Sequence, residues 1–341
     1  MTWMRSSRTR VAIAMISMAV LLPLAAAPAA ARDTAKAEHD RTIAYWTKDR
    51  IEHAIPRDFV KSGSAYKLNP NAKPNRPPTG GGGVTGASWT STSNPILARS
   101  GRVLFTMAGS DWICSGSVVD DSGRLGYSMV LTAGHCAIDE TTGRFATRWT
   151  FIPAFDTAPT YDCTSTSLPY GCWTATALVV RKEFATAGSF NDTAVTNDWA
   201  FAIVGPGGKS GNAQLDSTVG TYPIAFSTAS NSPVVKGDKL YAFGYPAAGK
   251  YHGKDLVYCA GAIIEDAGTS NLTWGMPCNM TGGSSGGPWL SNFETGTATL
   301  SSLNSYGYSG QSVMYGPKFN VRTSDTWTAA KSATSNRTVP N

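Results

Sequence analysis

The stretch Ser128-Met-Val-Leu-Thr-Ala-Gly-His-Cys136 joins an apolar run to a short turn that ends in a histidine and a cysteine. Residues 128–132 predict a buried strand, so His135 lies where the strand gives way to a turn. A bond from Cys136 to Cys114 would hold that junction against the neighbouring hairpin. His135 is therefore a candidate general base, and the alternative is a structural histidine of the core.

Short β-favouring runs recur on both sides of this stretch, between clusters of Gly, Pro, Asn and Ser. Besides 128–132, they cover residues 102–107, 112–119, 149–152, 173–180, 199–204, 239–243, 256–264 and 297–303. No helical pattern separates the runs, and beyond residue 96 only residues 324–333 indicate a helix. This arrangement favours an antiparallel sandwich or barrel over a parallel α/β sheet.

A second signature is the glycine-dense turn Thr281-Gly-Gly-Ser-Ser-Gly-Gly-Pro288. A nucleophilic serine needs such a turn, because glycine lets backbone N–H groups approach a developing oxyanion. Ser284 competes for the role, but the pattern Gly-x-Ser-Gly-Gly-Pro favours Ser285. We assign the oxyanion hole to the N–H groups of Gly283 and Ser285; the alternative is a flexible glycine loop.

An acid enters an apolar strand at Asn197-Asp198-Trp199-Ala-Phe201. A buried carboxylate must be hydrogen-bonded, and the Nδ1–H of a catalytic histidine would supply such a bond and fix the histidine tautomer. The nearest rival is Asp192, which lies in a polar run and is expected to be exposed. We therefore expect Asp198 to orient His135.

The order of these residues along the chain separates classes of hydrolase. The Gly-x-Ser-x-Gly elbow of α/β-hydrolases requires a histidine after the serine, and the last histidine here is His252. The subtilisin order requires an acid before His135, and the strand-rich body lacks the helices of that fold. The order His135, Asp198, Ser285 remains.

The Thr-Ala-Gly-His-Cys, Asp-Trp-Ala and Gly-x-Ser-Gly-Gly-Pro blocks resemble those of the chymotrypsin-like (trypsin-like) serine proteases, over about residues 100–322. The resemblance implies an all-β fold of two antiparallel six-stranded β-barrels with the active site between them, followed by the C-terminal helix. It also implies a secreted serine endopeptidase that works through an acyl-enzyme, with no metal and no cofactor. Two alternatives are a catalytically silent binding protein of the same fold and a serine esterase.

The departures from the family pattern concern activation and specificity. Ser284 stands where trypsin-type enzymes have an acid, and no Ile-Val-Gly-Gly start is present, so the chain is more similar to the bacterial glutamyl-endopeptidase-like branch. That branch usually has a histidine where this chain has Asn304, and trypsin-like enzymes have an aspartate where it has Asn279. Neither glutamate specificity nor a Lys or Arg preference is supported. The expected substrate-binding residues are Asn279, Met280, Asn304, Ser305, Tyr306 and Gly307.

Six cysteines form an even set without the Cys-x-x-Cys spacing of a zinc site, which favours three disulfides in an oxidising compartment. Chain order suggests the pairs Cys114–Cys136, Cys163–Cys172 and Cys259–Cys278.

The N-terminal third divides from the rest by composition. Residues 1–31 hold three arginines, an apolar run and a small-residue end, the pattern of a secretory signal peptide. The alternative, a membrane anchor, fits less well because Pro23 interrupts a run already shorter than about 20 residues. Residues 32–95 form a propeptide or N-terminal extension that ends in a Pro/Gly-rich linker, and residues 96–341 form the peptidase domain.

Within that extension, Ile51, Ala54 and Ile55 are expected on one helical face before Pro56 ends the turn. If activity requires removal of this extension, the unprocessed chain is a zymogen.

The formal charge of +6 is also uneven. Residues 1–31 carry +3, residues 32–95 carry +4 and residues 96–341 carry −1. A nearly neutral body offers no basic stripe for phosphates, so we expect no nucleic-acid partner. We expect a secreted, extracellular monomer that acts on polypeptide substrates and does not bind membranes once the signal peptide is removed.

Overall fold

The computed structural model describes residues 29–69, 86–91, 95–155, 168–247 and 253–340, together with Met1, Cys163 and Tyr251. Nearly all of the expected signal peptide, most of the linker and His252 lie outside the described residues. The helices are α1 (Ala29–Tyr45), α2 (Lys48–His53), α3 (Ile96–Arg99), α4 (Lys182–Ala185), α5 (Asp192–Val195), α6 (Leu215–Val219) and α7 (Val321–Ala330), with 3-10 turns η1 (Gly134–Cys136) and η3 (Ala267–Thr269).

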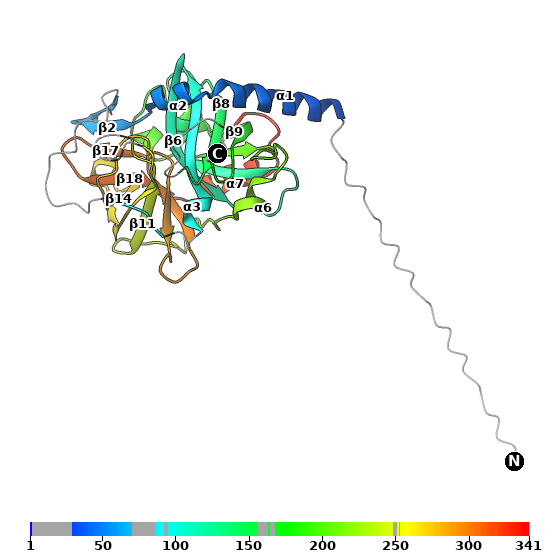
Figure 1. Ribbon diagram of the computed structural model, residues 1–341. Coiled ribbons are helices and arrows are strands. Elements are labelled where there is room, and N and C mark those ends of the chain that lie inside the picture. The colour runs from blue at the N-terminus through cyan, green and yellow to red at the C-terminus, as the bar shows by residue number, and fades with distance from the viewer. Residues whose placement is uncertain are drawn as a thin grey trace.

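Strands make up most of the regular structure of residues 96–341 (Figure 1). The strands are β1 (Ile55–Pro56), β2 (Phe59–Ser62), β3 (Ala65–Leu68), β4 (Ala87–Ser88), β5 (Ser100–Met107), β6 (Ser110–Val119), β7 (Ser128–Thr132), β8 (Thr147–Pro153), β9 (Trp173–Arg181), β10 (Ala200–Val204), β11 (Lys239–Gly244), β12 (Val257–Ala262), β13 (Ile264–Glu265), β14 (Thr273–Pro277), β15 (Pro288–Ser291), β16 (Thr299–Leu303), β17 (Tyr306–Tyr308), β18 (Val313–Pro317) and β19 (Arg337–Val339).

The first half of the body is a closed barrel of six antiparallel strands. Its order is β6-β5-β8-β9-β10-β7, and pairing between β6 and β7 closes the ring. Every residue of β7 and β10 is buried, as expected for runs without polar alternation that lie inside a barrel wall. The apolar strand before His135 therefore belongs to the core, which fixes the position of the turn that follows.

The strands of the second half lie in two sheets. One has the order β16-β15-β11-β12-β4 and the other the order β13-β14-β18-β17-β2-β3. The Cys259–Cys278 disulfide links the two sheets between β12 and the end of β14. The two sheets also meet where β18 lies against β16. A Cβ on Gly316 would lie 1.9 Å from the carbonyl oxygen of Leu303, so only glycine allows β18 to approach β16 this closely. The mainly β architecture expected from the sequence is confirmed. Among the described strands, pairing closes one six-stranded barrel, in the first half, whereas the strands of the second half lie in two sheets.

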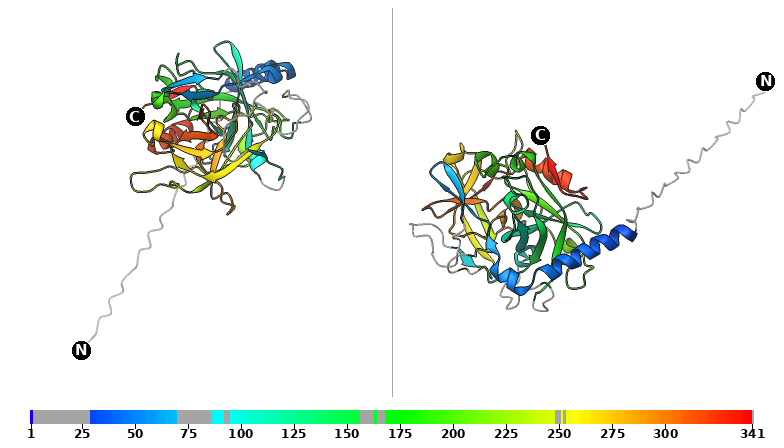
Figure 2. Two further views of the ribbon diagram at one scale, coloured as in Figure 1. Left: turned by 90° about the vertical axis from the view of Figure 1, so that its left-hand side faces the viewer. Right: turned by 90° about the horizontal axis from the view of Figure 1, so that it is seen from above.

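The N-terminal extension packs against the body over most of its described length, although α1 begins beyond the edge of the first barrel (Figure 1). Helix α1 lies along the first barrel (Figure 2), against β8 and β9. The Trp46 side chain after it is fully buried and donates its Nε1–H to the carbonyl of Arg148 at 2.8 Å. Ile51 and Ala54 are buried, as the pattern predicted. Ile55 is 41% exposed, because it already belongs to β1 and not to the helix.

Three strands of this extension pair with strands of the body, and one of them, β4, pairs antiparallel with β12. β1 pairs in parallel with β6 of the first barrel, through Ile55 and Pro56. β2 pairs in parallel with β17 in the second half, with Phe59 opposite Tyr306 and Lys61 opposite Tyr308. Residues 55–62 therefore cross from one half of the body to the other.

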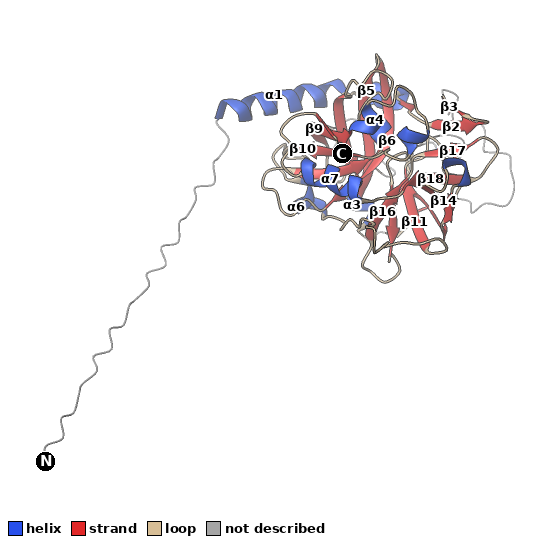
Figure 3. Ribbon diagram, turned by 180° about the vertical axis from the view of Figure 1, so that it is seen from behind, coloured by secondary structure: helices blue, strands red, loops and turns tan. Residues whose placement is uncertain are grey.

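The C-terminal helix expected from the sequence is α7, which packs on β9 and β10 at the back of the first barrel (Figure 3). Asn320 caps its N-terminus by accepting the N–H of Arg322, and Thr323 completes a capping box. Among the described residues, no helix has the length and apolar character needed to cross a membrane.

Trp46 should contribute strongly to the stability of the full chain. Trp46→Ala removes a fully buried indole, so we expect the free energy of unfolding to fall by about 3–5 kcal/mol. Leu125→Ala, at a residue that is 72% exposed, is the control and should change it by less than about 0.5 kcal/mol. Urea denaturation of the intact chain measures both values, and equal effects would contradict the packing of the extension.

Candidate active site

His135 lies in the 3-10 turn η1, directly after the buried strand β7. The Cys114–Cys136 disulfide ties this turn to β6, and the Cys163–Cys172 and Cys259–Cys278 pairs suggested by chain order are bonded as well. The His135 side chain is fully buried. Because a strand, a disulfide and core packing hold its backbone, the imidazole has a defined position.

Asp198 lies two residues before β10, and its carboxylate accepts three hydrogen bonds. Its Oδ1 accepts the backbone N–H of His135 at 2.9 Å, and its Oδ2 accepts from His135 Nδ1 at 2.8 Å. The hydroxyl of Ser305 donates to the same Oδ2 at 2.5 Å. The carboxylate is fully buried, and these donors compensate the loss of water. Bonding through Nδ1 leaves Nε2 as the proton-accepting nitrogen.

The rival acid, Asp192, is not part of this arrangement. Its side chain is 60% exposed and pairs with Lys61, whose Nζ lies 3.0 Å from Oδ1. The exposure expected for Asp192 is therefore observed, and the contact between acid and His135 is made by Asp198.

The turn that carries Ser285 is held by the first barrel. The N–H of Ser115 donates to the carbonyl of Ser285 at 2.7 Å, and its hydroxyl donates to the carbonyl of Gly283 at 2.8 Å. A Cβ on Gly286 would lie 2.3 Å from Thr132 Oγ1, and one on Gly287 would lie 2.0 Å from the carbonyl oxygen of Phe243. Gly286 thus lets the turn pack directly on the residues that precede His135, and Gly287 lets it pack on β11.

Within this turn the two serines are in different situations. The Ser284 hydroxyl donates to the carbonyl of Thr281 at 2.8 Å, within its own loop. Gly283 has a φ of +96°, a conformation that favours glycine. Among the described residues no acceptor is hydrogen-bonded to the N–H of Gly283 or of Ser285. Two adjacent free donors at a glycine turn can bind an oxyanion.

The proton-accepting side of His135 is also without a partner. Nε2 is buried and makes no hydrogen bond among the described residues. The structure thus joins His135 to Asp198 and packs the Ser285 turn against Thr132 and Ala133, without a hydrogen bond from Ser285 to Nε2. Such bonds are often loose before substrate binds.

The residues expected to bind substrate fall into three groups. Asn304 is fully buried, and its amide bonds to Trp289 Nε1 and to the carbonyls of Phe243 and Ser284. It supports the turn by donating to the carbonyl of Ser284. Asn279 accepts hydrogen bonds from the N–H of Gly86 and the hydroxyl of Tyr251. Met280 is buried.

The third group borders the site itself. Ser305 binds Asp198, and Tyr306 and Gly307 form the strand β17 that follows.

Two solved structures that are similar to this chain are bacterial proteases. The crystal structure of the protease Anisep from Arthrobacter nicotinovorans is 34% identical over 73% of this chain and 100% of that chain, with a TM-score of 0.59. The thermostable serine protease AL20 from an extremophilic microorganism is 36% identical over 70% of this chain and 100% of that one, with a TM-score of 0.57. The chain belongs to the bacterial chymotrypsin-fold serine proteases.

A Glu endopeptidase matches at 18% identity over 74% of this chain and 99% of its own, with a TM-score of 0.54, which shows the shared fold. No protein-family model and no curated protein matches the chain.

In this serine protease the N-terminal segment lies against the candidate site. The Phe59 ring stacks on Phe190 with centroids 3.9 Å apart and meets the His135 ring edge-on at 5.5 Å. Arg57 donates to the carbonyl of His135 at 2.7 Å and forms a buried ion pair with Glu140 at 2.8 Å. The sequence motifs gave no sign of these contacts, since they involve residues about 80 to 130 positions apart.

Asp58 occupies the space next to the nucleophile turn of the protease. A Cβ on Gly282 would lie 2.7 Å from the Cβ of Asp58, so the segment touches the turn one residue before Gly283. Burial raises the pKa of the Asp58 carboxyl to about 6, and the neighbouring His135 and the N–H of Phe59 partly oppose this rise.

A group of possible metal ligands occurs at the site, formed by Cys114, His135 and Cys136. Both cysteines are bonded to each other, so neither supplies the thiolate that a metal would need. These residues do not fit a metal ion.

The raised pKa of Asp58 gives the folded chain a specific pH dependence. Between about pH 4 and 6 the folded state keeps a proton that the unfolded state has lost, so its stability falls as the pH rises through this range. In the Asp58→Asn protein this contribution is absent. We expect the wild type to lose about 2 kcal/mol more stability than Asp58→Asn between pH 4 and 7. Chemical denaturation at a series of pH values measures it, and parallel curves would contradict the pKa.

Proposed function

We propose that the chain is a secreted serine endopeptidase in which Ser285 is the nucleophile, His135 the general base and Asp198 the residue that orients the histidine. The observation that carries the proposal is the fully buried His135–Asp198 pair, which is packed beside a glycine turn with two free N–H donors. Membership of the serine protease family supports the same reading.

In this mechanism Ser285 Oγ attacks the scissile carbonyl carbon while its proton moves to His135 Nε2. The bonds from Nδ1 to Asp198 keep Nε2 unprotonated beforehand and stabilise the imidazolium that forms. The carbonyl oxygen becomes an oxyanion bound by the N–H groups of Gly283 and Ser285. His135 then protonates the leaving amine, and water hydrolyses the acyl-enzyme by the same route in reverse.

Covalent labelling tests the assignment. A fluorophosphonate should react with Ser285 in the processed protein, and Ser285→Ala should remain unlabelled. Asp198→Asn should slow peptide hydrolysis by roughly 10⁴-fold, because the histidine takes the wrong tautomer.

The matched control for Asp198→Asn is Asp325→Asn, the same change at an exposed residue of α7, which should hydrolyse peptides at the wild-type rate. Circular dichroism verifies that each variant is folded. Equal labelling of wild type and Ser285→Ala would refute the nucleophile, and labelling of the wild type without peptide hydrolysis would favour an esterase.

We further propose that residues 1–31 direct secretion and that residues 32–95 are a propeptide, which makes the chain a zymogen with a peptidase domain at 96–341. The matched proteases align over their entire length with 73% and 70% of this chain, so part of it has no counterpart in them. Three disulfides suit an oxidising compartment. We propose that the processed enzyme acts as a monomer on polypeptides, with its second half completing a six-stranded barrel.

The direction of β2 supports the proposal that the unprocessed chain is inactive, which we call latency. β17 begins beside Ser305 and Asp198 and leads outward to Tyr308. A substrate whose acyl part pairs with β17 must end at Ser285, so it must run antiparallel to β17. β2 runs parallel to it. The propeptide therefore fills the substrate's place while its backbone is presented in the wrong direction for acyl transfer.

Latency can be measured as the labelling rate of the unprocessed chain, whose intact mass is verified. We expect the unprocessed chain to react with the fluorophosphonate much more slowly than the processed enzyme. Phe59→Ala removes the ring stacked on Phe190 and should speed labelling by about tenfold or more.

Val60→Ala is the control for this variant. Successive side chains of a strand point to opposite sides, and Val60 is half-buried while Phe59 is buried. It should change the labelling rate by less than about twofold. If the unprocessed and processed proteins label equally fast, the segment does not block the site.

A further inference from the structure

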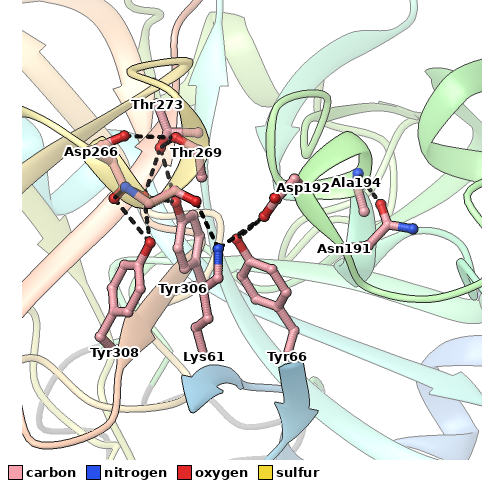
Figure 4. A network of polar contacts seen from close by, with 11 residues as sticks. Lys61, Tyr66, Asn191, Asp192, Ala194, Asp266, Thr269, Thr273, Tyr306 and Tyr308 are labelled. Carbon is pink, nitrogen blue, oxygen red and sulfur yellow. Dashed lines mark hydrogen bonds and ion pairs between the residues drawn. The ribbon is translucent and has the colours of Figure 1, made fainter. Parts of the chain in front are cut away.

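The Lys61 ammonium group is buried against the body of the protease. Lys61 lies on β2, and its side chain is 7% exposed. Its Nζ is 3.0 Å from Asp192 Oδ1 and donates to the carbonyl of Gly268 at 2.9 Å (Figure 4). Burying an ammonium group is unfavourable unless charge and hydrogen bonds compensate, so these contacts form a site built for a cation.

Most of this site belongs to the peptidase body and not to the propeptide. Asp192, Gly268 and Tyr308 all come from residues 96–341, and Nζ lies 5.6 Å from the centroid of the Tyr308 ring. The ring of Tyr66, on β3 of the extension, is 4.6 Å from Nζ. Removal of the propeptide would take away Lys61 and Tyr66 together and leave a carboxylate, a carbonyl and an aromatic face.

A second carboxylate, Asp266, organises the floor of the site. It is buried and accepts hydrogen bonds from the hydroxyls of Tyr306 and Tyr308 and from the N–H of Gly268. All of these donors are neutral, and among the described residues no cation pairs with Asp266. A negative charge without a cationic partner favours a cation nearby. Its bonds also fix the ring of Tyr308 and the residue Gly268, whose carbonyl accepts from Lys61.

The site has a defined distance from the catalytic residues. Phe59 and Lys61 are two residues apart on β2, so their side chains point the same way. Phe59 meets His135, and Lys61 reaches Asp192. The side chains of a substrate strand beside β17 also alternate between the two faces, but the substrate backbone runs in the opposite direction to β2. Its side chain two residues farther from the scissile bond than the one beside His135 would reach Asp192.

We propose that Asp192, the carbonyl of Gly268 and Tyr308, supported by Asp266, form a substrate subsite that selects a lysine-like cationic side chain two residues upstream of the residue beside His135. This inference rests on the proposed peptidase function and names the substrate class of the same site. Lys61 occupies the subsite in the unprocessed chain, and the substrate occupies it in the processed enzyme.

The test uses the processed enzyme, obtained by secretion of the full chain, with its new N-terminus determined by sequencing. Peptides of one parent sequence carry lysine, norleucine or glutamate at each of the five positions before the scissile bond. We expect lysine to exceed norleucine in kcat/KM by about tenfold, as for a charged hydrogen bond, at a single position, with glutamate poorest there.

In Asp192→Asn the lysine preference at that position should fall to about threefold, because the Gly268 carbonyl and the Tyr308 ring remain. Asp325→Asn, with the same charge change on α7, should keep the wild-type preference. Hydrolysis of norleucine peptides reports the function separately from the subsite.

Three results would overturn the subsite. They are cleavage of all peptides with lysine and norleucine within twofold at every position, an unchanged lysine preference in Asp192→Asn, and an active product that still contains Lys61. Failure of the proposed function looks different, since then no peptide is cleaved and fluorophosphonate does not react. In that case calorimetry measures the binding of the lysine and norleucine peptides to the same protein. A subsite predicts that the lysine peptide binds about tenfold more tightly than the norleucine peptide.

Discussion

The buried charge of Asp198 is the constraint on which the arrangement of the two halves depends. A carboxylate without water must receive hydrogen bonds, and its donors come from both halves. His135 follows β7 of the first barrel, while Ser305 directly precedes β17 of the second half. Displacing one half from the other would leave a buried anion short of a donor, which is strongly unfavourable. The geometry that orients the histidine is therefore also a junction between the halves, and Ser115 makes a second junction by holding the Ser285 turn from β6.

The same junction underlies the proposed latency of the unprocessed chain. Residues 55–62 pair with β6 on one side and with β17 on the other, so they span the two halves where Asp198 and Ser115 already join them. Arg57 reaches the carbonyl of His135, and Phe59 reaches its ring. Folding stability and latency consequently share contacts, because each interaction that seats the segment also links the halves. After removal of the segment, the bonds to Asp198 and those of Ser115 remain to hold the halves together.

The sequence predicted local features well and long-range ones poorly. The turn at His135, the glycines around Ser285 and the exposure of Asp192 follow from short motifs, and each is found in the structure. Chain order suggested the disulfide pairs because each closes a short loop. The pairing of β2 with β17 joins residues almost 250 positions apart, and no local pattern encodes a partner at such a distance. Asn304 was expected to face substrate, yet its side-chain amide bonds to the carbonyls of Phe243 and Ser284 and to the indole of Trp289. An isolated asparagine gives no signal that distinguishes the two roles.

The reversed direction of β2 is informative about specificity, because an enzyme recognises the side chains of a bound strand and the direction of its backbone separately. The subsites beside a strand recognise side chains by position and chemistry, whereas cleavage depends on the direction of the backbone. β2 satisfies the first requirement with an aromatic ring beside His135 and an ammonium group at Asp192, and it fails the second because it runs parallel to β17. A segment that must bind tightly without being cut should resemble a good substrate in its side chains alone. On this proposal Phe59 and Lys61, the two buried residues of β2, describe the substrate that the processed enzyme prefers at those two subsites.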